Sequence, residues 1–227
     1  MKPESWPCPL PDGGTTAEQV FACDRGRAFR LLIVPALFDE ANKLRRFAVE
    51  VLRRLDGAGI DAFLPDLPGC NESLQALDDQ TPAHWRAAMQ VAASHVRATH
   101  VLGLRGGALV MPAGLPGWRY APVNGASVLR QMLRARIVAA REAGRDETVD
   151  GLLDTGLAEG LDLAGYRLSG AFLREFQSLQ PAVAVAVSDI EQDMLGGGGG
   201  LWLRAEPDFD KAQADALAAI VALGMKA

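Results

Sequence analysis

The stretch that decides the fold is T-H-V-L-G-L-R-G-G-A-L-V-M-P-A-G, residues 99–114. It begins with a short apolar run, 101–104, which is typical of a buried strand. A glycine-flanked turn follows, with Arg105 at its centre and Gly106 and Gly107 after it. Glycine permits unusual backbone angles and close packing against neighbouring strands. The pattern therefore predicts a buried strand that turns sharply into a helix.

Length and composition favour one α/β domain. The chain has 227 residues, 49% of them hydrophobic, which is enough for one well-filled core and short for two. Charges interrupt the apolar runs throughout, so no stretch approaches the roughly 18 apolar residues of a membrane-spanning helix. Residues 1–14 hold four prolines and no apolar run, which is unlike a secretory signal. We therefore expect a cytoplasmic protein.

The charge and the cysteines exclude further classes. A net charge of −5 argues against nucleic acid as a partner, because that polymer requires a basic face. The arginines of 130–141 are expected on a solvated helix face. Cys8, Cys23 and Cys70 match no C-x-x-C spacing, so we expect reduced thiols, no metal site and no cofactor.

Strand-like and helix-like segments alternate, as in the βαβ units of a parallel sheet. Strands are expected at 19–23, 29–34, 60–65, 101–104, 118–123, 181–187 and 201–205, the first two forming an antiparallel hairpin. Helices are expected at 44–58, 82–97, 128–143, 148–158, 170–179 and 210–223, with a strand-like piece at 161–168 and a mobile five-glycine loop at 196–200. We expect a single domain, 1–227, in which residues 125–180 form a helical cap over the sheet.

Several motifs resemble a known superfamily. They are P-A-L-F-D-E-A-N-K-L-R-R (35–46), L-P-D-L-P-G-C-N-E-S (64–73), T-P-A-H-W (81–85), L-G-L-R-G-G-A-L (102–109) and L-A-G-Y-R-L-S (163–169). In these the chain resembles the α/β-hydrolases. More narrowly, it resembles the exosortase A system-associated "hydrolase 2" group, found with bacterial PEP-CTERM protein-sorting and exopolysaccharide genes. The resemblance implies an α/β-hydrolase fold with a mainly parallel sheet; activity is implied by analogy only.

The superfamily's catalytic triad is incomplete in this chain. The G-x-S-x-G nucleophile position of that superfamily carries Arg105, which stays protonated and cationic at any working pH and cannot act as a nucleophile. Asp189 stands where the superfamily's acid would follow a later strand, although a strand-end turn aspartate is an equally good interpretation. No histidine occurs after His100, so the triad's base is missing. These departures argue against a Ser-His-Asp mechanism.

Other groups offer weak alternatives for catalysis. Cys70 and Ser73 lie on the turn after the second parallel strand, at the sheet edge where sites form. A thiolate there needs a base or a lowered pKa, and His84 is the nearest histidine in sequence. The acidic pairs 39–40 and 78–79 suit acid/base work but are more typical of solvated loops.

Arg105 supports two interpretations. A guanidinium at a helix start suits an external carboxylate or phosphate, bound together with the Gly106 backbone. The alternative is an internal salt bridge to Asp39, Glu40 or Asp66. The other residues expected to line this cleft are Asn42 and Lys43, on a loop, and Phe38, as a wall aromatic.

The sequence thus predicts a hydrolase-like protein that binds an anionic small molecule or serves as an accessory protein in an exosortase-associated pathway. One alternative is an active ester or thioester hydrolase, or an acyltransferase, with an unconventional nucleophile. Another is a structural subunit that joins a protein partner of the same pathway through its cap.

Overall fold

The computed structural model describes residues 1–227 and contains a seven-stranded central sheet. In spatial order its strands are β1 (Lys2–Pro9), β2 (Thr15–Cys23), β4 (Asp61–Pro65), β3 (Arg30–Val34), β5 (His100–Leu104), β6 (Gly117–Tyr120) and β9 (Val187–Ile190). From β4 to β9 all neighbours are parallel, whereas β1 and β2 are antiparallel. Every residue of β3 and β4 is buried, because helices cover both faces of a parallel sheet. The predicted mainly parallel α/β architecture is confirmed.

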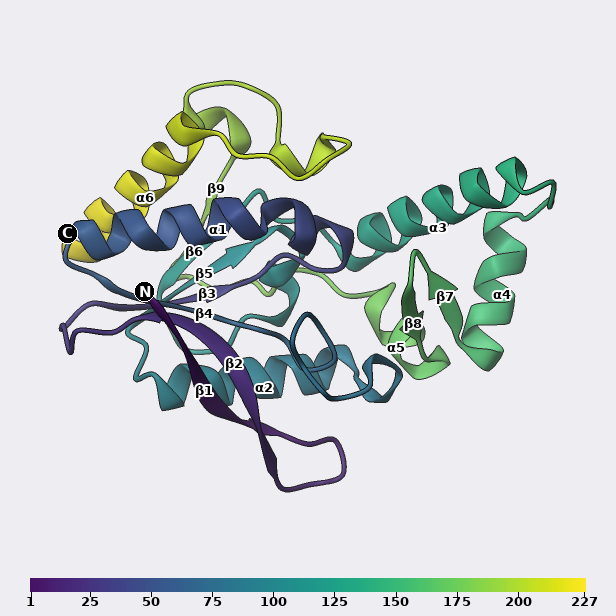
Figure 1. Ribbon diagram of the computed structural model, residues 1–227, viewed down its shortest axis with the longest axis horizontal. Coiled ribbons are helices and arrows are strands. Elements are labelled where there is room, and N and C mark those ends of the chain that lie inside the picture. Colours follow the sequence, from purple (N-terminus) through teal and green to yellow (C-terminus); the bar gives the residue numbers. More distant parts are fainter.

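Helices cover the two faces of the sheet, as Figure 1 shows. α1 (Asp39–Gly57) and α6 (Lys211–Lys226) pack side by side on one face, and α2 (Pro82–His95) lies on the other. Each face has its own apolar core, and the core on the α2 side continues into the segment between β6 and β9. No helix combines the length and the apolar character that crossing a bilayer requires.

Capping side chains set where the helices begin. The Thr81 hydroxyl accepts a hydrogen bond from the His84 amide (3.0 Å), and Pro82 occupies the first helical position of α2. Asp210 caps α6 in the same way, through the amide of Gln213. These starts follow the sequence prediction, because both caps are local.

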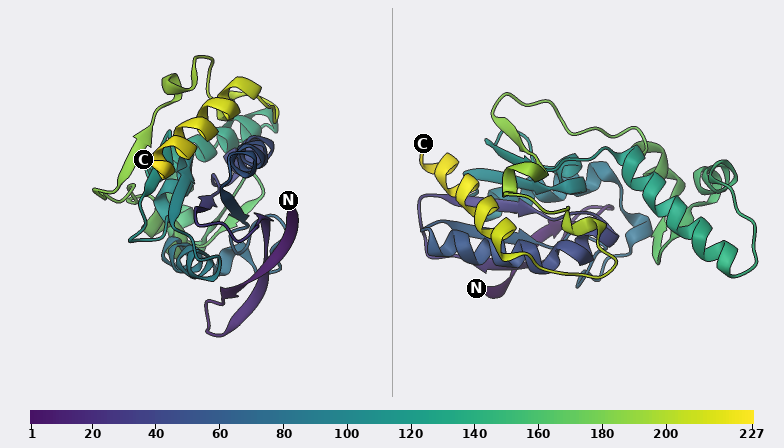
Figure 2. Two further views of the ribbon diagram at one scale, coloured as in Figure 1. Left: turned by 90° about the vertical axis from the view of Figure 1, so that its left-hand side faces the viewer. Right: turned by 90° about the horizontal axis from the view of Figure 1, so that it is seen from above.

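A separate group of elements lies beyond the carboxyl ends of the parallel strands, and we call residues 125–176 the cap (Figures 1 and 2). It contains α3 (Gly125–Glu142), α4 (Val149–Glu159), the hairpin of β7 (Leu161–Leu163) and β8 (Tyr166–Leu168), and α5 (Gly170–Phe176). Its apolar side chains join the α2-side core, so the cap packs on the body through apolar contacts.

The predicted hairpin of residues 19–23 and 29–34 is wrong. β4 lies between β2 and β3 and pairs with both. β3 is wholly apolar after Arg30 and is buried on both faces, so it takes a central position with parallel neighbours. The hairpin partner of β2 is β1, which lies within the proline-rich N-terminal residues.

Two predicted strands near the C-terminus are also wrong. Residues 181–186 form no strand, and Val183 and Val185 are fully exposed. In the parallel register of β6 and β9 these residues would face 113–116, a segment that precedes the first residue of β6 and contains Gly114 and Pro116, which disfavour a strand. Residues 201–205 contain a 3₁₀ turn (Leu201–Leu203) instead of a strand, and β9 is left as the sheet edge.

The helix expected after β5 is only a 3₁₀ turn, Arg105–Val110. Two consecutive glycines weaken helix formation at its start, and Pro112 blocks extension after it. Two shorter 3₁₀ turns, Leu77–Asp79 and Gln192–Leu195, complete the secondary structure.

Candidate functional site

Arg105 lies at the tight corner that follows β5. Its φ is +51°, a left-handed value that is strained for a residue with a side chain. A Cβ on Gly107 would lie 2.3 Å from the Pro35 carbonyl oxygen, so only glycine permits this approach between the corner and the end of β3. Gly106 is buried against Leu37, which leaves its backbone covered by protein. The corner predicted from sequence is therefore present, with an arginine at its tip.

The Arg105 side chain is paired inside the fold. Its Nη2 donates to Glu40 Oε1 at 2.9 Å, its Nε donates to Glu40 Oε2 at 3.2 Å, and its Nη1 donates to the Ala121 carbonyl at 2.8 Å. The two side chains are only 12% and 5% exposed. This two-pronged geometry is the strong form of a charge-assisted hydrogen bond.

Trp202 covers one face of the Arg105 guanidinium, and Arg105 Cζ lies 4.0 Å from the centroid of the indole ring. A cation over an indole face is attracted by the ring electrons. Trp202 belongs to the segment between β9 and α6. Arg105, Glu40 and Trp202 therefore form one packed group at the corner after β5.

The carboxylates considered as internal partners of Arg105 differ in their contacts. Glu40, one of the three carboxylates considered, is its partner, whereas Asp39 pairs with Lys43 (2.8 Å) and Asp66 pairs with Arg45. In this structure Glu40 occupies the Nε and Nη2 donors of the Arg105 guanidinium, as the internal salt-bridge interpretation expects, and anion binding there stays a prediction.

Residues 39–43 form the first turns of α1 and not the predicted loop. Acidic residues at a helix start are favoured by the helix dipole, which accounts for Asp39 and Glu40 there. Asn42 Nδ2 donates to the Tyr166 hydroxyl of the cap at 3.1 Å, while Lys43 stays with Asp39. The start of α1 therefore contacts both the corner and the cap.

Two small cavities lie where the cap meets the body. One, of about 200 Å³, is lined by Phe38, Tyr166 and three apolar or small side chains of α3, Val128, Met132 and Ala135, among others. The second, of about 160 Å³, shares Phe38 and Tyr166 with the first and is also lined by Leu67, Cys70 and Asn42. Seven of the ten residues that line each cavity are hydrophobic, so the space suits an apolar group.

Phe38 is the central aromatic side chain of this region. It is buried, and its ring lies 5.3 Å from that of Tyr166, 5.7 Å from Phe176 and 5.8 Å from Trp85, centroid to centroid. The prediction of a wall aromatic agrees with this position. The sequence does not reveal Tyr166 and Trp202 as site residues. Tyr166 meets Phe38 and Asn42, and Trp202 meets Arg105, only through long-range packing.

Cys70 lines the second cavity but is not activated. Burial raises the pKa of its thiol to about 12, and the nearby carboxylates of Asp66 and Glu18 act in the same direction. A thiol with this pKa is not ionised at neutral pH. His84 gives it no base, since its Nε2 lies 3.1 Å from the Pro9 carbonyl oxygen.

Ser73 serves the turn after β4. Its hydroxyl donates to Glu18 at 2.7 Å and accepts from the amides of Gly69 and Gln75. A serine in this network stabilises the turn through local hydrogen bonds. Nothing in its contacts supplies a histidine.

Asp189 is separated from any base. It lies on β9, and its carboxylate accepts from Arg119 Nε of β6 at 2.5 Å. His100, at the start of β5, stacks on Trp118, and burial lowers the pKa of its imidazole. His95 ends α2. The structure therefore brings together no nucleophile, histidine and acid.

No group of three or more histidine, cysteine, aspartate and glutamate side chains converges as metal ligands would. The acidic pair Asp78 and Asp79 lies exposed in the turn before α2.

Comparisons with known proteins support the fold. No family model matches the chain, and no curated protein matches it. Among solved structures, it is similar to mouse alpha/beta hydrolase domain-containing protein 10, with a TM-score of 0.59, 13% identity and coverage of 92% of this chain and 94% of that one. It is also similar to the esterase domain of a Rhodothermus marinus protein, with a TM-score of 0.56, 12% identity and coverage of 100% and 99%. A third is DcsB in complex with its substrate analogue, with a TM-score of 0.56, 11% identity and complete coverage of both chains. At these identities the likeness concerns the fold alone, and the chain has an α/β-hydrolase fold.

Proposed function

We propose that this chain is a binding or accessory protein on an α/β-hydrolase scaffold, which holds a ligand at the interface of cap and body without Ser-His-Asp hydrolysis. The observation that carries the proposal is Arg105, which occupies the corner position and is locked by Glu40 and Trp202. An arginine has no hydroxyl or thiol with which to attack an acyl group. The histidines all precede this corner, so no general base approaches it from the C-terminal part.

The chemistry of the cavities favours an apolar ligand group. Phe38 and Tyr166 line both small cavities, and the side chains around them are mostly hydrophobic. The Asn42 amide and the Tyr166 hydroxyl, which bond to each other, are polar groups able to orient a ligand. The ligand we propose therefore has an alkyl or similar apolar part and a neutral polar end.

The setting we propose is the cytoplasm of a bacterium, in an exosortase-associated exopolysaccharide pathway. Support for this pathway comes from the motif resemblance alone.

Activity-based labelling tests the absence of hydrolysis. The protein is incubated with a fluorophosphonate probe, with iodoacetamide and with p-nitrophenyl acetate and butyrate. We expect the esters to be cleaved no faster than in buffer without protein. We also expect no labelling of Ser73 or Cys70 in the folded protein at pH 7. Turnover that disappears in Cys70→Ala or Ser73→Ala, but persists in the surface control Ser94→Ala, would establish the hydrolase or acyltransferase alternative.

Calorimetric titration tests the ligand class. We expect 1-octanol to bind. Met132→Lys should weaken octanol binding about tenfold, because it places a charge in the cavity. Val138→Lys, on the exposed face of the same helix, should leave octanol binding unchanged. Octanoate and inorganic phosphate should bind no better than octanol. If both anions bind tightly and Arg105→Met abolishes that binding, the site is an anion pocket after all.

The heteromer alternative is supported by one feature of the cap, Val138 of α3, which is 56% exposed. Native mass spectrometry after co-expression with hydrolase-like proteins of the same locus tests it. A stable complex lost in Val138→Lys would favour the structural-subunit interpretation over ligand binding.

A further inference from the structure

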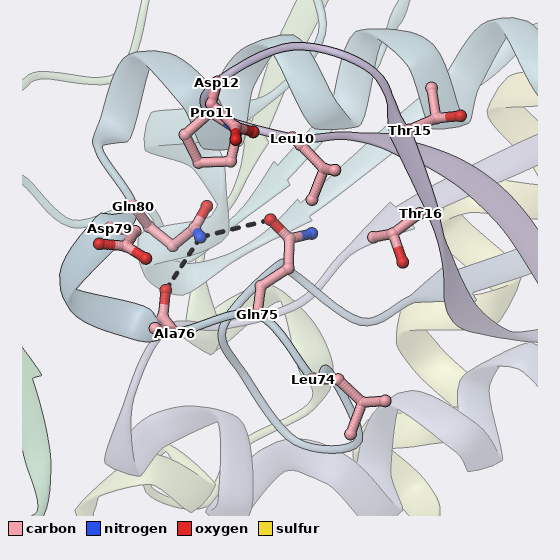
Figure 3. A pocket seen from close by; sticks show the side chains of 10 residues that line it. All are labelled: Leu10, Pro11, Asp12, Thr15, Thr16, Leu74, Gln75, Ala76, Asp79 and Gln80. Atoms are coloured by element: carbon pink, nitrogen blue, oxygen red, sulfur yellow. Dashed lines mark hydrogen bonds between the residues drawn. The ribbon is translucent and has the colours of Figure 1, made fainter.

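A second groove, of about 740 Å³, lies between the β1–β2 turn and the segment that precedes α2. Figure 3 shows its lining side chains. It shares no residue with the two cavities at the cap and contains none of the residues proposed for that site.

The side chains that line this groove include hydrogen-bond acceptors and two carboxylates but no positively charged group. Asp12 contributes a carboxylate from the β1–β2 turn and Asp79 from the opposite wall, and neither forms an ion pair. No lysine, arginine or histidine lines the groove. Behind Gln75, which is a lining residue, the buried Glu18 carboxylate accepts from the Gln75 side chain at 2.9 Å and also lacks a cationic partner.

Gln80 adds an independent observation. Its side chain lines the groove although the residue is completely buried. The amide nitrogen donates to the Ala76 carbonyl at 2.9 Å and to Gln75 Oε1, and these are the two dashed lines of Figure 3. The amide oxygen, Oε1, has no hydrogen-bond partner. A buried acceptor without a donor is costly, so a ligand that brings an N–H group to it gains that bond in full.

We propose that this groove binds a small organic cation that carries N–H donors, a guanidinium or a primary ammonium. The ligand N–H groups bond to Gln80 Oε1, and its charge is neutralised by Asp79 and Asp12. The exposed Leu74 side chain, on the rim, contacts the aliphatic part of such a ligand. This proposal is independent of the function proposed for the two cavities between the cap and the body.

Titration calorimetry with agmatine, putrescine and tetramethylammonium tests the proposal. Agmatine carries a guanidinium and an ammonium, putrescine carries two ammonium groups, and tetramethylammonium has the charge but no N–H. We expect agmatine or putrescine to bind and tetramethylammonium to bind at least about tenfold more weakly, since a hydrogen bond between charged and neutral partners is worth that factor. Equal binding of all three cations, or no binding of agmatine and putrescine at millimolar concentration, overturns it.

Variants locate the site. Asp79→Asn and Gln80→Met should each weaken agmatine binding about tenfold, whereas Asp78→Asn, in the same turn but outside the lining, should not. If Asp78→Asn and Asp79→Asn weaken agmatine binding equally, the cation is held by the general negative charge of this surface, and the proposed site is refuted. If Gln80→Met does not fold, the pair Asp12→Asn and Asp79→Asn carries the test. Octanol binding at the cap should be unchanged in all of them, which keeps the two proposals separable.

Discussion

At the scale of single residues, the side chain at the corner after β5 determines what chemistry this position can perform. A hydroxyl at this position can attack a substrate, but a guanidinium requires a counter-charge. Glu40 supplies that charge and Trp202 covers it, so Arg105 serves the structure. The ion pair is nearly buried, and pairs of this kind become expensive when one partner is removed.

Placing a hydroxyl at the corner by Arg105→Ser should therefore not create a hydrolase. We expect no ester turnover above buffer, because no histidine lies near the corner, and a loss of about 3 kcal/mol in the free energy of unfolding from the unpaired Glu40. Urea unfolding with the p-nitrophenyl ester assay measures both.

The double variant Arg105→Met with Glu40→Leu separates charge from packing. It should recover most of the stability lost in Arg105→Ser, because no carboxylate is then left buried and unpaired. A stable, hydrolytically active Arg105→Ser variant would contradict the structural role of the pair.

At the scale of elements, the turn between β2 and β3 is tied to the end of α1 by arginines. Asp56 accepts from Arg25 Nε and from Arg27 Nη1, each at 2.8 Å, and these bonds lower the pKa of its carboxyl to about 2. A lowered folded-state pKa means stability that is complete above the unfolded value of about 3.9 and lost as pH falls through 2.

Asp56→Asn should thus lower Tm by roughly 2 to 4 °C at pH 6. The difference from the wild type should shrink between pH 4 and pH 2 and vanish below, as differential scanning calorimetry across this range can show. Asp154→Asn, an exposed position outside every ion pair, is the control. A difference that stays constant down to pH 1.5 would mean that the Asp56 carboxylate contributes through something other than its charge.

The elements also show what the sequence can predict. α2 follows directly from Thr81 and Pro82, and α6 from Asp210, since a cap is decided within four residues. The valines at 183 and 185 have strand propensity, yet they stay exposed because their would-be partner strand contains Gly114 and Pro116. Strand formation depends on a neighbour far away in the chain, and a single sequence does not reveal the register.

The candidate site was predictable only in part, for the same reason. The glycine pattern located the corner, and the charge of Arg105 required a partner, with Glu40 among three candidates. Trp202 carried no local signal, because nothing near it in sequence indicates that its ring would lie over residue 105. The role of Gln80 was not predictable either, since its side-chain oxygen lacks a hydrogen-bond partner only in the folded structure.

At the scale of the whole molecule, cap and body form one apolar unit. Phe38 lies just before the first residue of α1 in the body. Its ring lies among those of the cap residues Tyr166, Phe172 and Phe176, and Trp85 of α2 contacts the same cluster. One continuous core predicts that the two parts unfold together.

Phe38→Ala should break this coupling. We expect a loss of about 3 to 4 kcal/mol in the free energy of unfolding, because the cluster loses a buried ring and keeps a cavity. We also expect the amides of α4 and α5 to exchange with solvent through an opening that spares the sheet, which hydrogen-exchange mass spectrometry can resolve. Tyr166→Phe is the matched control, since it removes only the bond to Asn42 and should cost about 1 kcal/mol or less. The contrary outcome is that the cap amides of the unmodified chain already exchange through an opening of the cap alone. The cap would then move independently of the body. A ligand could in that case reach the cavities beside Phe38 without unfolding of the sheet.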